Sequence, residues 1–248
     1  MDHIEHSRTM LRRRVTTAQN GRMQPTAEDV RAIPHFTPLT TREAELVAPL
    51  LRSVRLDERQ RLIAEGEPCE GFYFVRRGRL RLFRTAPDGR EQTLRIVAAG
   101  ETFGEVPVFD GGPNAASAEA IEPADVVLVP LAVAQVLVER YPEVARRLLR
   151  HLAARLRAFN ELVEQLSLQT VQQRLARYLY FAAKETGVET AGGIAVERRL
   201  SGQDLASLVG SVREVVARTL KGLEDEGVIV IERQRYLIRS LEELRRYF

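Results

Sequence analysis

The stretch from Pro142 to Leu168 has the pattern of one uninterrupted helix, and this constrains the fold more than any other feature. Pro142 suits the first turn, where its missing N–H would have no helical partner. Apolar residues then recur at alternating spacings of four and three, the a/d seam of a coiled coil: Ala145, Leu149, Leu152, Leu156, Phe159, Val163 and Leu166. The helix would be about 40 Å long. We expect a dimer interface formed by Leu149, Leu152, Leu156, Phe159, Val163 and Leu166; the alternative is packing on the chain's own sheet.

Short apolar runs separated by glycines precede this helix and predict an antiparallel sandwich or barrel. The glycines stand at positions 66, 78, 89, 100 and 104. Several runs alternate with a period of two, as half-buried strands do. The expected strands are Arg61–Ala64, Phe72–Val75, Leu80–Phe83, Gln92–Val97 and Val126–Val129. Ala86–Gly89 predicts a hairpin turn, because Pro87 presets φ and Gly89 accepts a positive φ.

A short helix is expected before these strands, opened by Thr40 or Thr41. The apolar residues whose spacing fits this helix are Leu46, Val47, Leu50 and Leu51.

The excess positive charge lies at the N-terminus. The formal net charge is +3, and residues 1–24 hold five arginines against one aspartate and one glutamate. Residues 1–25 are polar and aperiodic, which predicts a disordered basic arm. Residues 171–248 hold 13 basic and 11 acidic side chains, so bulk charge gives little support for nucleic-acid binding.

Cys69 is the only cysteine. A disulfide scaffold and a cysteine-built zinc or iron–sulfur site within one chain are therefore excluded. No stretch approaches the roughly 20 apolar residues of a membrane helix, and the N-terminus lacks the apolar run of a signal peptide. We expect a soluble, cytoplasmic protein with no membrane partner.

A small domain is expected from residue 170 onward. An amphipathic helix over 171–184 and a loop at Gly187–Gly193 come first. Ser201–Asp204 then has the pattern of a capping box, in which hydroxyl and carboxylate each accept a hydrogen bond from a free backbone N–H. A helix through Val209, a left-handed turn at Gly210 and a second helix over Val212–Gly227 follow.

Strands at Val228–Ile231 and Tyr236–Ile238 complete this domain as a basic-tipped hairpin. A helix-turn-helix followed by such a hairpin is typical of a winged-helix DNA-binding domain.

Polar side chains gather on one face of the second helix: Arg213, Glu214, Ala217, Arg218 and Lys221. Their spacing places them opposite the apolar stripe. The alternative is a charged face that simply contacts solvent. However, the second helix of a helix-turn-helix, which follows the turn, is the recognition helix that enters the major groove. Arg213 and Arg218 can bind guanine, and Glu214 can accept from cytosine. The groups suited to backbone phosphates are Ser201, Gln203, Ser211 and Lys221.

Taken together, these features resemble the cyclic-AMP receptor protein and FNR (CRP/FNR) superfamily of bacterial transcription regulators. The resemblance rests on the glycine-punctuated strands, Phe103-Gly104-Glu105, the long helix and VGSVREVVARTLKGLEDEG at Val209–Gly227, and spans about residues 33–240. It implies an α+β fold with an N-terminal β-roll of the cyclic-nucleotide-binding, jelly-roll type. The implied parts are a disordered arm (1–25), a sensor domain (26–141), a dimerisation helix (142–169) and a winged helix-turn-helix domain (170–248).

The same resemblance implies what the protein does. The family reads bases through an Arg-Glu-x-x-x-Arg pattern, which Arg213, Glu214 and Arg218 reproduce. We expect a homodimer on promoter DNA, at a palindrome with TGTGA-like half-sites about one helical turn apart, with RNA polymerase as a partner. Activation and repression both stay open. No catalytic constellation is present, so we expect no enzyme.

The implied effector pocket departs from the family pattern. Relatives that bind cyclic nucleotides use the glutamate of Phe-Gly-Glu for the ribose and an arginine about ten residues later for the phosphate. Here Glu105 is followed by Ala115 and Ala116 in place of arginine and serine, and Phe159 and Asn160 replace hydroxyls that contact adenine. Burying a phosphate without a cation is costly, so we expect no cyclic AMP. The residues of any effector pocket are Phe72, Phe74, Phe103, Gly104, Glu105, Ala115, Ala116, Phe159 and Asn160.

Several interpretations of the sensor stay open. It binds an apolar effector among Phe72, Phe74, Phe103 and Phe159; it is ligand-free, with Phe159 filling the cavity; or it responds through the arm, where Thr16 and Thr17 are candidate phosphorylation sites. A cyclic nucleotide or a heme-bound gas is the alternative effector. For His35 and His151 we favour surface or hydrogen-bonded roles over iron ligation. No cofactor and no metal site are expected.

Overall fold

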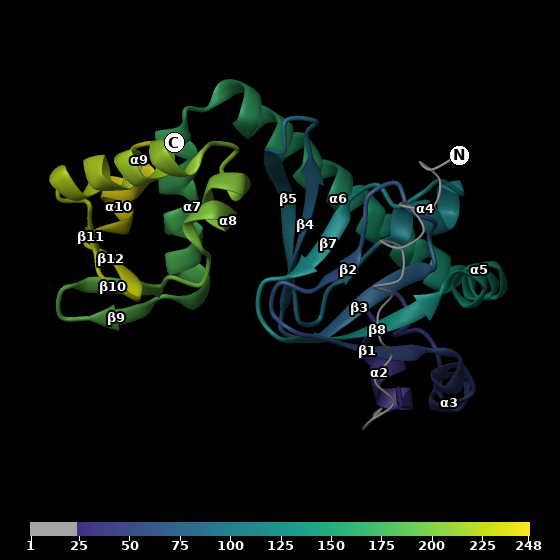
Figure 1. Ribbon diagram of the computed structural model, residues 1–248. Coiled ribbons are helices and arrows are strands. Elements are labelled where there is room, and N and C mark those ends of the chain that lie inside the picture. Colours follow the sequence, from purple (N-terminus) through teal and green to yellow (C-terminus); the bar gives the residue numbers. More distant parts are fainter. Residues whose placement is uncertain (1–23) are drawn as a thin grey trace, which may run out of the picture.

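The computed structural model describes residues 24–248, which form a β-roll, a long helix and a smaller winged-helix part (Figure 1). Most of the predicted basic arm, with Thr16 and Thr17, lies outside the described residues. The elements up to the long helix are α2 (Ala27–Ala32), α3 (Thr41–Val47), η1 (Ala48–Leu50), β1 (Arg52–Leu56), β2 (Arg61–Ile63), β3 (Gly71–Arg77), β4 (Arg79–Thr85), β5 (Glu91–Ala98), β6 (Thr102–Phe103), α4 (Glu105–Asp110), β7 (Ser117–Ala120), β8 (Ala124–Pro130) and α5 (Leu131–Arg140).

The β-roll consists of two antiparallel sheets, in the strand orders β1-β8-β3-β6 and β2-β7-β4-β5. Apolar side chains from both sheets, including Tyr73, Leu80 and Phe103, share one core cluster. The predicted turn between β4 and β5 is confirmed: Gly89 has φ +84°, and the Gly89 N–H donates to the Ala86 carbonyl over 2.9 Å. The α+β prediction with an N-terminal β-roll is confirmed.

Helix α3 begins after Thr40, whose hydroxyl accepts from the Glu43 N–H while the Glu43 carboxylate accepts from the Thr40 N–H. Only some of the apolar residues predicted to form its buried face are in fact buried. Val47 lies in the core, whereas Leu46 is 70% exposed. Ala44 and Val47, three residues apart, form the buried face, which turns Leu46 toward solvent.

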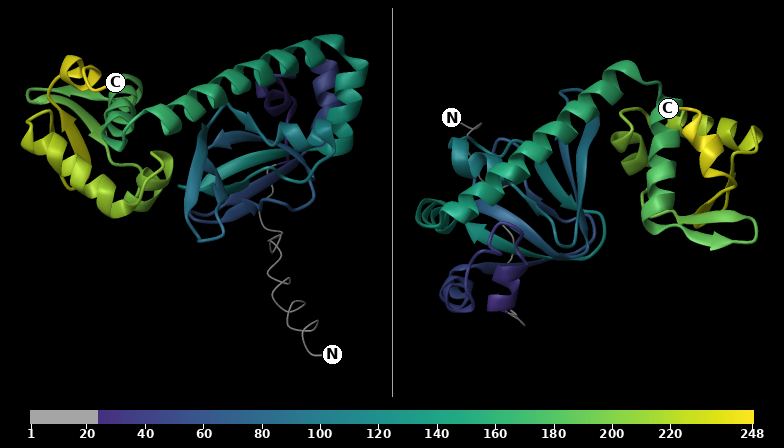
Figure 2. Two further views of the ribbon diagram at one scale, coloured as in Figure 1. Left: turned by 90° about the horizontal axis from the view of Figure 1, so that it is seen from above. Right: turned by 180° about the vertical axis from the view of Figure 1, so that it is seen from behind.

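The long helix α6 (Pro142–Leu168) has the predicted bounds. It crosses the β-roll, and its far end reaches the winged-helix part (Figure 2). Val144 and Leu148 are buried and face the roll. The predicted seam lies elsewhere on the helix: Leu149 and Leu156 are 64% and 62% exposed.

The winged-helix part contains α7 (Val171–Thr186), β9 (Val188–Thr190), β10 (Gly193–Glu197), α8 (Gly202–Leu208), α9 (Arg213–Asp225), β11 (Ile229–Ile231), β12 (Arg235–Ile238) and α10 (Leu241–Arg245). Both helices of the predicted helix-turn-helix and both wing strands are confirmed. The predicted loop at Gly187–Gly193 is wrong in part, because β9 pairs with β10. All three residues of β9 are exposed, so this edge strand has no apolar alternation to predict it.

Within residues 24–248, no helix combines the length and apolar character needed to cross a membrane.

Candidate functional site

The face of α9 that the sequence singled out is exposed. Gly210 forms the preceding turn with φ +63°. Val216, Leu220 and Leu223 are buried and hold α9 on the domain core. Arg213, Glu214, Ala217, Arg218 and Lys221 are exposed on the helix. The three predicted base-reading residues therefore share one accessible surface.

The predicted phosphate-binding groups differ in their surroundings. Gln203 is exposed and Ser211 half-buried. The Lys221 ammonium lies 3.0 Å from Glu224 and 3.1 Å from Asp225 on its own helix. Ser201 caps α8 by accepting from the Asp204 N–H over 3.1 Å, and its hydroxyl also contacts the Arg59 guanidinium at 3.2 Å.

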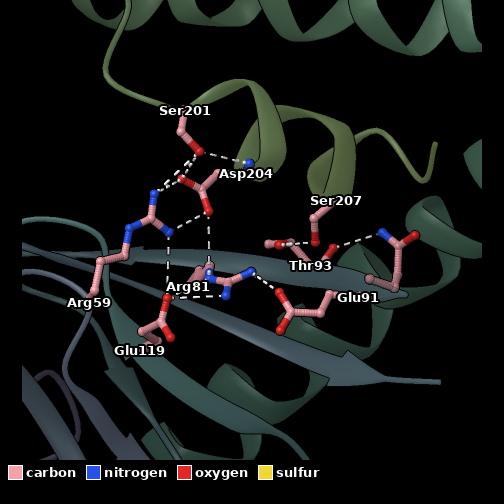
Figure 3. Close-up of polar contacts among 9 residues, drawn as sticks. Arg59, Arg81, Glu91, Thr93, Glu119, Ser201, Asp204 and Ser207 are labelled. Atoms are coloured by element: carbon pink, nitrogen blue, oxygen red, sulfur yellow. Dashed lines mark hydrogen bonds and ion pairs between the residues drawn. The ribbon is translucent and has the colours of Figure 1, made fainter. Parts of the chain in front are cut away.

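Only one of the two hydrogen bonds of the predicted capping box at Ser201 forms: the Ser201 hydroxyl accepts from the Asp204 N–H. The Asp204 carboxylate does not return to the Ser201 backbone; it accepts from the Ser201 hydroxyl over 2.6 Å and from both terminal nitrogens of Arg59 over 2.8 and 2.6 Å. Arg59 belongs to the β-roll, in the turn between β1 and β2. This carboxylate thus joins the two parts of the molecule (Figure 3).

The contact between the roll and α8 extends beyond that pair. Glu119 lies 3.5 Å from Arg59 and 3.1 Å from Arg81, and the Thr93 and Ser207 hydroxyls are 2.8 Å apart (Figure 3). Arg59 has a left-handed φ of +65°, which costs about 1–2 kcal/mol for a residue with a side chain. The backbone strain at Arg59 coincides with the point where the roll meets the winged-helix part.

Arg174 of α7 connects the end of α6 to the turn before the recognition helix. Its guanidinium donates to the carbonyls of Val209, at 2.6 Å, and Gly210, at 3.4 Å. It also donates to the carbonyls of Gln165, at 3.3 Å, and Gln169. Nothing in the sequence pattern singled out this arginine.

The aromatic residues expected to line an effector pocket are divided between two core clusters and the surface of α6. Phe72 and Phe74 belong to the core cluster shared with α2 and α3. Phe103 belongs to the core inside the roll, stacked on Tyr73 with ring centroids 5.2 Å apart. Phe159 is 51% exposed on α6, so within this chain it does not fill a cavity.

The remaining pocket candidates lie on other elements. Gly104 has φ +85° and is the N-cap of α4; Ala115 is exposed and Ala116 half-buried in the segment before β7. Asn160 is exposed on α6. Neither Ala115 nor Ala116 supplies a charge to this region.

Glu105, expected to contact a ribose, is instead surrounded by two histidines. Its Oε1 lies 3.4 Å from His35 Nε2 and 3.3 Å from His151 Nε2. Burial favours the neutral acid, but the imidazoles of His151 and His35 and the Thr102 hydroxyl outweigh it and hold the pKa of Glu105 well below its ordinary value. The carboxylate is therefore ionised and already engaged.

Comparisons with known proteins agree with this architecture. Residues 53–141 match the cyclic nucleotide-binding domain, and residues 173–247 match the Crp-like helix-turn-helix domain. The chain is 35% identical over 185 residues to the CRP-like cAMP-activated global transcriptional regulator of Mycobacterium tuberculosis, covering 75% of this chain and 83% of that protein. It is 31% identical to the cyclic AMP receptor protein of Thermus thermophilus, covering 79% of this chain and 88% of that protein.

Solved structures show the same fold. A transcriptional regulator of the CRP family from Thermus thermophilus superposes with a TM-score of 0.65 at 30% identity, over 78% of this chain and 95% of that chain. FixK2 from Bradyrhizobium japonicum gives a TM-score of 0.69 at 24% identity, over 79% of this chain and 96% of that chain, a likeness of fold alone.

A recognition helix with one exposed polar face beside a wing defines a helix-turn-helix DNA-binding protein. With a cyclic-nucleotide-binding-type roll before it and these relatives, the chain belongs to the CRP/FNR family of transcription regulators.

Proposed function

We propose that this regulator acts as a homodimer on a palindromic promoter site with TGTGA-like half-sites, in contact with RNA polymerase. The observation that carries the proposal is the exposed face of α9, where Arg213, Glu214 and Arg218 stand together. Two arginines and a glutamate on one helix face can read guanine and cytosine edges. A symmetric protein then reads a symmetric site.

The exposed seam of α6 supports the dimer. Leu149, Leu156, Phe159 and Val163 are 48–64% exposed within one chain, and they repeat with coiled-coil spacing. A contiguous apolar stripe of this kind marks an interaction surface, and a regular a/d seam is complementary to a second copy of itself.

DNA binding measured at fixed salt tests this proposal. Arg218→Ala is expected to weaken binding to a TGTGA-containing palindrome by about 5- to 150-fold and to relax preference at one base position, since a bidentate pair contributes about 1–3 kcal/mol. Arg245→Ala removes an equally charged, exposed side chain from α10 and serves as the control. Equal affinities of the two variants, or no loss when the G·C pairs are scrambled, would contradict the proposal.

The regulator binds this DNA without cyclic AMP and needs no cofactor in order to bind it. Ala115 and Ala116 offer no cation to a cyclic phosphate, and the Glu105 carboxylate lies between His35 and His151. Gating by cyclic AMP is the alternative, favoured by the names of the Mycobacterium and Thermus relatives.

Isothermal titration with cyclic AMP and with cyclic di-GMP distinguishes the two. Heat consistent with dilution alone, together with unchanged DNA affinity, is expected. Tight stoichiometric binding of either nucleotide, poor apo-protein binding that improves on adding cell extract, or a Soret band in the purified protein would point to an effector-gated regulator.

A further inference from the structure

Two imidazoles and one carboxylate converge where α6 lies on the β-roll. His35 comes from the turns between α2 and α3, Glu105 is the first residue of α4, and His151 lies on α6. The nitrogen and oxygen atoms that could hold an ion lie within 4.8 Å of one another. Among residues 24–248 this is the one group of three or more such side chains. His35 and Glu105 are buried and His151 half-buried.

The two distances between the carboxylate and the imidazoles match those of neighbouring ligands around a small cation. Glu105 Oε1 lies 3.4 Å from His35 Nε2 and 3.3 Å from His151 Nε2, longer than the roughly 2.9–3.0 Å of an ordinary N–H···O hydrogen bond. Metal–ligand bonds of about 2.0–2.2 Å in a tetrahedron separate neighbouring ligand atoms by about 3.3–3.6 Å. Both separations fall in that range.

His151 Nε2 is buried and, although it lies 3.3 Å from Glu105 Oε1, it makes no hydrogen bond within the described part of the chain. A buried polar atom left unsatisfied is costly. A cation between the three side chains would satisfy this nitrogen. His35 Nε2, now 2.9 Å from the Thr102 hydroxyl, would exchange that contact for the ion.

The charges around the cluster admit a cation. Arg95 and Arg155 both contact Glu101, at 2.8 and 2.9 Å. Glu101 thus pairs with both arginines, which leaves the Glu105 carboxylate to face the two imidazoles. Two histidines and a carboxylate form a ligand set suited to zinc-like ions.

We propose that His35, Glu105 and His151 bind one divalent transition-metal ion of the zinc class per chain. The ion joins the N-terminal segment, the roll and the dimerisation helix, and it leaves a fourth position open. This site does not depend on the proposed DNA-binding function, because its test measures metal alone.

Cobalt(II) titration of the chelator-treated, full-length protein tests the proposal, since Co²⁺ takes the same ligands as Zn²⁺ and its visible absorption reports coordination number. We expect one Co²⁺ per chain, with the intense bands of four- or five-coordination and no sulfur charge-transfer band from Cys69. His151→Gln is expected to weaken binding by at least about 100-fold, because even residues that only support ligands cost about 10–100-fold when changed. Glu105→Gln is expected to do the same.

The paired variant His3→Gln with His6→Gln is the control, because these are the other histidines of the chain. Its cobalt spectrum and affinity should equal those of the wild type. Since His151→Gln could also alter folding, its circular dichroism and Tm in chelator are compared with the wild type's. Zn²⁺ at a hundredfold excess over Kd should raise the wild-type Tm by about 5 °C or more. No stoichiometric binding by the wild type, a sulfur band, or loss of binding in the His3/His6 variant would overturn the proposal.

Discussion

Asp204 shows how one carboxylate can connect two parts of a molecule. It is 4% exposed and receives the Arg59 guanidinium and the Ser201 hydroxyl. Burial by itself would raise the pKa of this carboxyl, but the hydrogen bonds from Arg59 and Ser201 dominate and lower it from 3.8. The charged form is therefore the one that stabilises the fold.

Asp204→Asn should lower the free energy of unfolding in urea by about 1–3 kcal/mol near neutral pH, because the hydrogen bond to a charged group is lost. A group whose pKa is lowered on folding stabilises the protein above its unfolded value and loses that effect as pH falls through the folded value. The difference in unfolding free energy between wild type and variant should thus be constant above about pH 5. It should shrink as the pH falls below 3.8, the ordinary pKa of an aspartate.

Asp225→Asn is the matched control for this pH dependence. Asp225 pairs with Lys221 on the surface of α9 and is 64% exposed, so its loss should change the unfolding free energy by less than about 0.5 kcal/mol. A difference for Asp204→Asn that persists unchanged at pH 3 would show that its charge is not what matters.

The sequence predicted the exposed polar face of α9 but not the contacts between distant segments. Arg213, Glu214 and Arg218 lie close together along one helix, so periodicity alone places them on one face. His35 and Glu105 are separated by 70 positions, and only the folded roll places them near His151. The same holds for Arg59 and Asp204, 145 positions apart.

At the scale of elements, the turn between α8 and α9 is tightly constrained. Gly210 has φ +63°, and an added Cβ would lie 2.6 Å from Leu166 Cδ2 and 2.8 Å from Gln92 Oε1. The end of α6 and strand β5 thus both press on this turn. Arg174 holds it from the third side.

Gly210→Ala should therefore destabilise the protein by at least about 1–2 kcal/mol, the cost of a left-handed backbone with a side chain, and reduce DNA affinity. Gly222→Ala is the control: it lies inside α9 with open space around an added Cβ, so it should stabilise by up to about 1 kcal/mol. Urea denaturation of both variants measures the contrast. No loss of stability for Gly210→Ala would mean that the turn can relax.

Elements with strong periodicity or capping patterns were predictable, and short elements were not. The long helix α6 and the pair α8 and α9 follow from apolar spacing and turn chemistry. Helices α2 and α4, each of six residues, are too short for a periodic pattern, although α2 has a capping box between Thr26 and Asp29. Strand β9 is an exposed edge strand. Their existence depends on tertiary packing.

At the scale of the whole molecule, the resemblance to the family predicted the order of the parts, but not how the roll meets α8. That contact combines the salt bridge of Arg59 with the Thr93–Ser207 pair, and none of these residues forms part of the recognition surface. The polar face of α9 and the seam residues Leu149 to Val163 of α6 that are exposed in one chain both stay accessible, as the proposed symmetric dimer requires.

Leu156→Glu tests this unit directly. Leu156 is 62% exposed in the single chain, so the change should leave chain stability nearly intact. In a symmetric dimer it removes two leucines from one interface, at about 1.5–3 kcal/mol each, which weakens dimerisation by about 10²- to 10⁴-fold. Sedimentation velocity should then show a monomer at micromolar concentration, and affinity for the full palindrome should fall to that for one half-site.

Leu46→Glu provides the comparison, since Leu46 is 70% exposed on α3, away from the seam. This variant should sediment as a dimer and bind the palindrome like the wild type. If Leu156→Glu also remains a dimer, α6 is not the interface, and the two recognition helices are brought to the DNA by another surface. If Leu156→Glu is a monomer that keeps full affinity for the palindrome, dimerisation and DNA recognition are not coupled through α6.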